Sequence, residues 1–153
     1  MLSQTAEYAL RAVSCLAAEA GTPLSADRIA ERTAIPRRYL TRVLQALREH
    51  RLVGSRSGPG GGYELLEPPG LTTILDVVDA VAPIPRIERC PLGIESHRSL
   101  CPLHSAIDVA YEKIRSAFAE VTLAQLVGSK GGRGPLCEER TPRTAGARLR
   151  KRK

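Results

Sequence analysis

The 153-residue sequence lacks the long apolar run that a signal peptide or a membrane-spanning helix needs. Its longest apolar stretch near the start, Ala12 to Ala18, is interrupted by Ser14 and flanked by Arg11 and Glu19. We therefore expect a cytoplasmic protein that is neither secreted nor bound to a membrane. In the cytoplasm, stable disulfides are a poor explanation for the four cysteines.

Sequence patterns of common enzymes are also missing. No serine–histidine–acid order, paired-carboxylate motif or nucleotide loop stands out. The glycine-rich stretch 58–62 is not followed by Gly-Lys-Ser/Thr, which excludes a phosphate-binding loop. Cys101 and His104 could form a thiolate–imidazolium pair, but their loop supplies no obvious substrate pocket. We therefore expect no enzyme.

The charge is distributed unevenly along the chain. The formal net charge is +7, and the segment from Lys130 onward, with nine Lys or Arg and two Glu, accounts for all of it. Because this segment is rich in glycine and poor in apolar residues, we predict a disordered basic tail over 129–153. The tail would add sequence-independent affinity for DNA, or remain a solvated end. Within 28–56, eight arginines accompany only two glutamates, which favours a nucleic-acid partner.

Apolar periodicity predicts three short helices in the first fifty residues. The first covers 4–19 with Ser3 as its cap, the second follows Ser25, and the third has Pro36 at its first helical position. In the third helix the apolar residues of 40–47 form one stripe, and the opposite side is polar and basic. A helix, a short turn and a basic second helix are typical of a helix-turn-helix, although an ordinary solvated helix face is the simpler alternative.

Two short strands, 52–53 and 63–66, follow and predict a β-hairpin with the glycine cluster at its tip. Apolar segments flank it closely, which argues against a flexible linker. We interpret the hairpin as a wing whose glycines permit positive φ and let backbone N–H groups approach phosphate. The residues that we expect to contact DNA are Arg37, Arg38, Tyr39, Thr41, Arg42, Gln45 and Arg48 on the third helix, and Arg56, Ser57, Gly58, Pro59, Gly60 and Gly61 in the wing.

The fold class that follows is mainly α with a small β-hairpin, a winged helix-turn-helix over 1–82 plus a long C-terminal dimerisation helix. A helix that begins at Thr72 or Thr73 ends near Pro83, and a longer one covers 105–121. The longer helix has an apolar seam that fits a partner helix or a core equally well. The seam consists of Ile107, Ala110, Ile114, Ala117 and Val121.

Several segments resemble the Rrf-two family of bacterial winged-helix transcription regulators, of the IscR and NsrR type. They are Tyr39-Leu40, Leu44-Gln45-Ala46-Leu47, Leu52-Val53 and RSGPGGGY from Arg56 to Tyr63, and the resemblance covers about residues 1–128. It implies a homodimeric repressor that binds a palindromic operator in double-stranded DNA, with 105–128 as the dimerisation region. A glutamate that some members carry is replaced by Thr41, so we expect an operator preference different from that of the cluster-biogenesis regulator. A winged-helix module that binds a protein through the same face is the alternative, and steep salt dependence of duplex binding would argue against it.

The loop 83–104 holds Cys90, His97, Cys101 and His104. Thiolate and imidazole are ligands that iron–sulfur clusters and zinc share, so the composition predicts a metal site without naming the metal. Four explanations are open: a two-iron two-sulfur cluster with mixed ligands, a zinc or other mononuclear site, redox-active thiols, and a loop that binds nothing.

The family resemblance implies the cluster, and with it the sensing of redox, nitric oxide or iron status. Cys90 and Cys101 match the first and last of three family cysteines, and His104 matches a histidine that sometimes follows. The middle cysteine is missing, and His97 is a candidate substitute. Glu7 matches an acidic ligand of some members, though it also suits the start of a helix.

Without a cluster, thiols or a small ligand would carry the signal. The other two cysteines lie outside this loop. We predict that Cys15 is a core residue and that Cys137 is not a ligand.

Overall fold

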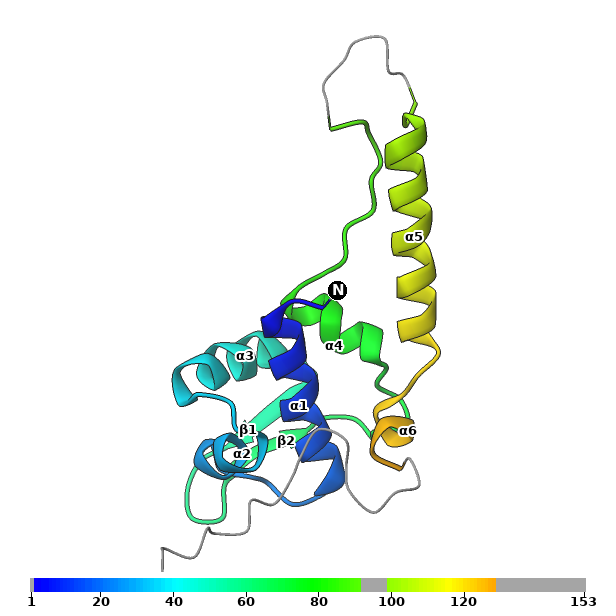
Figure 1. Cartoon of the computed structure of the whole chain (residues 1–153). Helices are drawn as coiled ribbons and strands as arrows, with labels where there is room; N and C mark the ends of the chain where they lie inside the picture. The colour runs from blue at the N-terminus through cyan, green and yellow to red at the C-terminus, as the bar shows by residue number, and fades with distance from the viewer. Residues whose placement is uncertain (1, 92–98, 129–153) are drawn as a thin grey trace, which may run out of the picture.

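The computed structural model describes residues 2–91 and 99–128. The predictions for His97, Cys137 and the basic tail lie outside these residues. The elements are α1 (Gln4–Ala18), α2 (Ala26–Thr33), α3 (Arg37–Glu49), β1 (Val53–Arg56), β2 (Gly62–Leu65), α4 (Ile74–Val81), α5 (Pro102–Ala119) and α6 (Leu123–Gly128). Figure 1 shows α1–α4, the hairpin and α6 gathered into one body, from which α5 extends with the segment 83–91 beside it. The mainly helical fold with one hairpin is confirmed.

α1 lies at the centre of the body, where α2, α3, α4 and α6 all contact it. Its start was predicted correctly, since the Ser3 hydroxyl accepts a hydrogen bond from the Ala6 N–H at 3.2 Å. Apolar side chains such as Val13 and Cys15 are fully buried among these helices. Burial of one such side chain stabilises the fold by about 1.5–3 kcal/mol, and Cys15 is a core residue as predicted.

The helix-turn-helix consists of α2 and α3. Ser25 caps α2, and Ala34 ends it with a left-handed backbone at φ 54°. The predicted place of Pro36 was wrong by one residue, because it forms the N-cap and α3 begins at Arg37. The apolar stripe of α3 is confirmed, since Leu40, Val43, Leu44 and Leu47 are all buried. Burial of this stripe against α1 leaves the basic side of the helix in solvent.

The hairpin follows α3 directly. β1 is longer than the predicted 52–53, and β2 has the predicted length but begins one residue before the predicted 63–66. β1 and β2 pair antiparallel from Val53 opposite Leu65 to Arg56 opposite Gly62. Leu24 forms an isolated antiparallel β-bridge with Tyr63. The Leu24 N–H donates to the Tyr63 carbonyl at 2.9 Å, and the Leu24 carbonyl accepts from the Tyr63 N–H at 2.8 Å. This pairing fastens the hairpin to the segment before α2.

The glycines of the hairpin serve two purposes. Gly58 and Gly60 at the tip have φ of 93° and 76°, where other residues are strained, as the turn prediction required. Gly62 is different, because a Cβ there would lie 2.5 Å from the backbone of Leu24. The cluster therefore shapes the tip and also allows the backbone of β2 to pack closely on the segment before α2.

α4 begins after Thr73, which forms a capping box with Asp76. The Ile74 N–H donates to the Val121 carbonyl at 2.9 Å, so the chain after α5 returns to the start of α4. α6 then packs against α1, with Leu123 fully buried. These contacts return the chain to the main body of the fold after α5.

α5 differs from the helix predicted over 105–121, since it spans Pro102–Ala119 and has Cys101 at its N-cap. A proline in the first turn favours this earlier start, and it places His104 on the helix instead of in a loop. The apolar seam is not a core: Ile114 is 40% exposed, and Asp108 is the one buried residue of the whole helix. No helix of the described residues is long and apolar enough to span a membrane.

Candidate functional site

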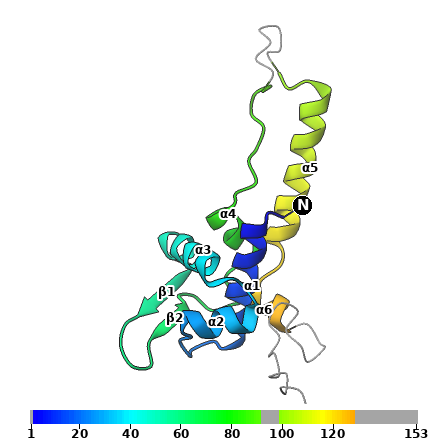
Figure 2. The same ribbon diagram turned by 60° about the vertical axis from the view of Figure 1, so that its left-hand side comes forward.

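The outer face of α3 carries the predicted DNA-contacting residues in solvent, on the same side of the body as the hairpin (Figure 2). Arg37 is the first of these, and its side chain is already held. Its Nε donates to Asp27 of α2 at 2.7 Å, and its Nη1 donates to the Thr41 hydroxyl at 3.2 Å. The Thr41 hydroxyl in turn donates to the Arg37 carbonyl at 3.1 Å. Two of the predicted DNA-contacting residues, Arg37 and Thr41, therefore already form hydrogen bonds within the protein.

Arg38 lies over an aromatic ring on the same face. Its guanidinium carbon is 4.7 Å from the centroid of the Tyr39 ring, and its Nη2 lies 3.3 Å from the Tyr39 hydroxyl. The Tyr39 ring stands 6.0 Å from the ring of Tyr8 on α1. Stacking of this kind limits the orientations of a long side chain, so Arg38 is pre-oriented at the surface.

Arg42 and Arg48 are the exposed arginines of α3 for which the described part of the chain shows no hydrogen bond or ion pair. Between them, Gln45 donates to Glu49 at 3.0 Å. An open groove of about 610 Å³ runs between this half of α3 and the hairpin, lined by Thr41, Gln45, Arg48, Glu49, Val53, Gly54, Ser55 and Tyr63. The two arginines are therefore available for an anionic partner beside a concave surface.

The hairpin presents its tip, residues 57–60, as exposed residues. Arg56 lies at the end of β1, and its Nε is 2.7 Å from Glu64 on β2, with the arginine side chain 68% exposed. The sequence placed Arg56 in a loop, whereas the strand and this ion pair fix its base. The Glu64 side chain is only 19% exposed, so the arginine is the solvent-facing member of this pair.

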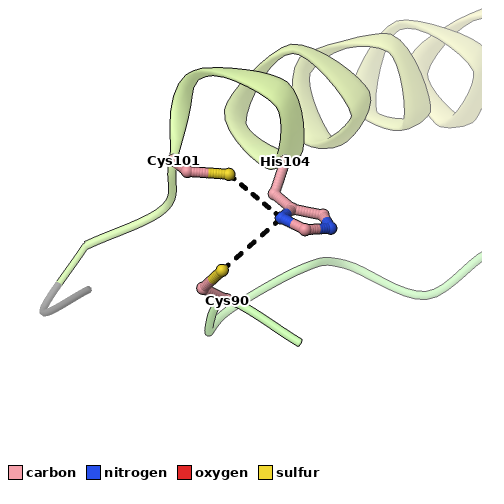
Figure 3. Close-up of side chains that lie close together, drawn as sticks. All are labelled: Cys90, Cys101 and His104. Carbon is pink, nitrogen blue, oxygen red and sulfur yellow. Dashed lines mark hydrogen bonds between the residues drawn. The ribbon is translucent and has the colours of Figure 1, made fainter. Parts of the chain in front are cut away.

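A second group of side chains converges at the far end of α5 (Figure 3). The Sγ atoms of Cys90 and Cys101 lie 3.5 Å and 3.2 Å from Nδ1 of His104. The ligand atoms of the three residues all lie within 4.8 Å of one another, and all three residues are partly buried. Cys90 belongs to the segment after α4, while Cys101 and His104 belong to the N-cap and first turn of α5. The fold thus brings together three of the sequence-predicted ligands.

Their chemistry fits a metal centre. One Nδ1 atom has a single proton or a single lone pair, so it cannot satisfy two thiols equally well by hydrogen bonding. Two thiolates and one imidazole instead form a donor set that suits zinc or an iron–sulfur cluster. Both kinds of centre need a fourth ligand. Glu7 is not part of any such group among the described residues, and His97 lies outside them.

Two arginine–carboxylate pairs, which sequence reasoning missed, join α5 to its neighbours. Arg86 donates to both oxygens of Asp108 at 2.8 and 2.7 Å and also pairs with Glu112 at 2.5 Å, while the Ile87 N–H donates to Asp108 at 2.9 Å. The hydrogen bond from Arg86 lowers the pKa of Asp108 to about 2, with a further contribution from the Ile87 N–H. The spacing of His104, Asp108 and Glu112, four residues apart on one helix face, was the available signal.

The second pair lies nearer the body. Arg115 donates to both oxygens of Asp79 on α4 at 2.9 Å each and to the Ile84 carbonyl at 3.2 Å. The hydrogen bond to Asp79 raises the pKa of Arg115 above its ordinary value, so the guanidinium stays charged. This pair therefore fastens the base of α5 to α4.

Comparison with known proteins agrees with this architecture. The family model Rrf2, described as an iron-dependent transcriptional regulator, matches residues 2–129. An rrf2-like HTH-type transcriptional regulator of Rhodobacter capsulatus is 36% identical over 132 residues, which cover 83% of this chain and 85% of the relative. Transcriptional regulators, and not enzymes, make up these matches.

Two solved structures have the same fold. IscR of T. potens superposes with a TM-score of 0.71 at 24% identity, over 84% of this chain and 86% of its own. CymR, the global cysteine regulator of B. subtilis, superposes with a TM-score of 0.70 at 24% identity, over 86% and 98%. The shared fold is a winged helix followed by a long helix.

Proposed function

Because the chain belongs to the Rrf2 family of transcriptional regulators, we propose that it is a homodimeric repressor that binds a palindromic operator in double-stranded DNA in the cytoplasm. One observation carries the DNA-binding part of this proposal. An exposed arginine-rich face of α3 lies beside a glycine-tipped hairpin, with an open groove between them. A helix of this kind enters the major groove while the wing follows the backbone or the minor groove.

The roles of individual residues follow from how each side chain is held. Arg42 and Arg48 would contact phosphates or bases directly, since no described partner holds them. Arg38, oriented by the ring of Tyr39, would contact the duplex at the start of α3. In the wing, Arg56 and the backbone N–H groups of the tip would contact the neighbouring phosphates.

The dimer would form through α5. The helix extends from the body, and its apolar seam is largely in solvent, with Ala110, Ile114 and Ala117 exposed. A second copy of the same helix covers such a seam most simply, because a two-fold axis lets each copy bury the other. Two α3 helices would then stand at a fixed spacing, which a palindromic operator requires.

The metal site would add a signal to this arrangement. Cys90, Cys101 and His104 would hold a two-iron two-sulfur cluster or a zinc ion, and the family description as iron-dependent supports the cluster. A bound cluster supplies bonds that oxygen, nitric oxide and iron limitation can break. Glu7 would complete the site only from a second copy, because the start of α1 lies near the base of the segment 83–91 in Figure 1, away from the start of α5.

The chain's own residues would convert the signal into a change of DNA affinity. Cys90 lies on the segment after α4, and its two partners lie at the start of α5, so the occupied site ties these segments together. Release of Cys90 would loosen α5 and alter the spacing of the two α3 helices. Because both half-sites must be bound at once, a small change of spacing has a large effect on operator affinity.

Purification without oxygen tests the metal part. We expect visible absorption together with equal amounts of iron and sulfide, and a different operator affinity after the metal is removed. Equal affinity with and without metal would exclude the sensing mechanism. A colourless protein that contains zinc would identify a mononuclear site. A metal-free protein that still binds DNA would leave a regulator that responds through its thiols or a small ligand.

Selection of duplexes from a random pool, followed by titrations at several salt concentrations, tests the DNA part. We expect a palindromic sequence and an affinity that falls steeply with salt, because phosphate contacts release counterions. Binding that does not depend on salt, or no selected duplex at all, would favour a winged-helix module for a protein partner.

A further inference from the structure

We propose that Arg86 and Asp108 are positioning residues, which hold Cys90 against Cys101 and His104 before any metal binds. The inference rests on the proposed metal site. The ion pair of Arg86 with Asp108, which does not itself bind the metal, would hold the three ligands in position. The segment 83–91 carries Cys90, and its attachment to α5 determines where Cys90 lies.

The attachment is polar and well defined. Arg86 forms a two-pronged pair with Asp108, and the Ile87 N–H donates to the same carboxylate, so two successive residues of the segment bind one side chain. A planar guanidinium that meets a carboxylate in this way fixes orientation as well as distance. Cys90 follows three residues after Ile87, and this attachment therefore sets where its sulfur can reach.

The helix side of the attachment is equally specific. Asp108 stands one turn after His104, so the carboxylate and the imidazole share one face of α5. The residue Asp108 is only 9% exposed, whereas every other residue of α5 is more exposed. The polar pair is therefore a well-defined contact between the segment and α5, and it lies beside the partly buried Ile87.

This pair differs from the one at the base of the same helix. Arg115 and Asp79 have the same two-pronged geometry, but they join α5 to α4, and Arg115 contacts the segment 83–91 at the Ile84 carbonyl, six residues before Cys90. Asp79→Asn is therefore a matched control for Asp108→Asn. Both changes remove one charge and leave an amide of the same shape, but only Asp108→Asn removes the attachment next to Cys90.

Two measurements on the full-length, metal-free protein test the proposal. The first is a titration with Co²⁺, followed by the thiolate-to-cobalt absorption. We expect Asp108→Asn to weaken cobalt binding by about 10–100-fold, as is typical when a residue that orients a ligand is lost. Asp79→Asn should bind within about threefold of the unchanged protein. Arg86→Gln should show the same loss of cobalt affinity. It is the test variant if Asp108→Asn does not fold.

The second measurement needs no metal. Diamide takes up the two electrons and two protons that the thiols of Cys90 and Cys101 lose when they form a disulfide. Trypsin cleaves after Arg89, Arg98 and Lys113, so the disulfide links the peptides 90–98 and 99–113 in a mass spectrum. We expect Asp108→Asn to form this linked pair several times more slowly than Asp79→Asn.

The outcomes distinguish the positioning role of the ion pair from the existence of the metal site. Unchanged cobalt affinity and unchanged disulfide rate in Asp108→Asn would overturn the positioning role, and so would equal losses in Asp79→Asn. If the unchanged protein binds no cobalt, the mononuclear form of the proposed metal site fails. The disulfide rate then decides the positioning role alone.

Discussion

Arg37 on α3 donates a hydrogen bond from Nε to Asp27 on α2 at 2.7 Å, and this bond joins the two helices of the helix-turn-helix at their outer surface. The pair is exposed, with side-chain exposures of 50% and 86%, so it contributes little to stability. Its consequence is electrostatic. A carboxylate stands on the surface that is proposed to meet phosphate, and it occupies an arginine that would otherwise be available to the duplex.

Replacement of Asp27 by Asn should therefore strengthen DNA binding. We expect a several-fold higher affinity for duplex DNA of random sequence. The change removes a negative charge that repels phosphate, and it frees the Arg37 guanidinium to bind phosphate. Fluorescence anisotropy with a random and a selected duplex measures both affinities. A loss of affinity for the selected duplex alone would mean that Asp27 orients Arg37 toward a base.

Arg42 and Arg48 should each contribute directly to DNA affinity. We expect Arg42→Ala and Arg48→Ala to weaken binding about tenfold each and to reduce the slope of log affinity against log salt by about 1. Lys113→Ala is the matched control, since it removes the same charge from α5. An equal loss in all three variants would show that only total charge matters and would contradict the assignment of α3.

Much of the DNA-binding body was predictable because its signals are local. Ser3 and Ser25 were recognised as caps, and the leucines of α3 repeat with helical spacing, so neither depends on distant residues. The strand ends were missed because the pairing extends through Gly54 and Gly62, and glycine is depleted in strands. The requirement for glycine at position 62 comes from the backbone of Leu24, which is far away in sequence.

The candidate metal site was predictable only in its ligands. Cys90, Cys101 and His104 were selected by residue type, and the structure brings them together. The start of α5 was missed because Pro102 was considered part of a metal loop and not the first turn of a helix. The pair of Arg86 with Asp108 spans 22 residues, and the four-residue spacing of His104, Asp108 and Glu112 marks one helix face but does not identify Arg86 as the partner.

Gly62 should be required for the fold and not for DNA contact. Its φ of 151° and the 2.5 Å approach of an added Cβ to Leu24 predict that Gly62→Ala destabilises the protein by about 2 kcal/mol or more. Gly70→Ala is the control, since a Cβ there meets nothing within 4 Å. Thermal melting of both variants measures the difference, and equal melting temperatures would contradict the close approach.

The pair of Arg86 with Asp108 should make stability sensitive to acid. The folded-state pKa of Asp108 is about 2, below the ordinary value of 3.8, so its stabilising contribution is complete above about pH 5. The contribution is lost as the pH falls toward 2, because protonation then favours the unfolded chain. We expect the stability difference between the unchanged protein and Asp108→Asn to shrink over this range in urea titrations. A difference independent of pH would mean that the charge of Asp108 is not what stabilises the segment.

The exposed seam of α5 should be the dimer contact. We expect Ile114→Glu to weaken the dimer at least about 100-fold, because a second copy of the helix would have to bury a carboxylate beside apolar side chains. Lys113→Glu introduces the same side chain at the neighbouring position and should leave the dimer intact. Analytical ultracentrifugation measures the association, and anisotropy with the palindrome should show that Ile114→Glu also loses operator affinity, since a monomer occupies one half-site at a time. An unchanged protein that sediments as a monomer, or equal losses in both variants, would exclude α5 as the interface, and the operator would then be read by single copies of α3.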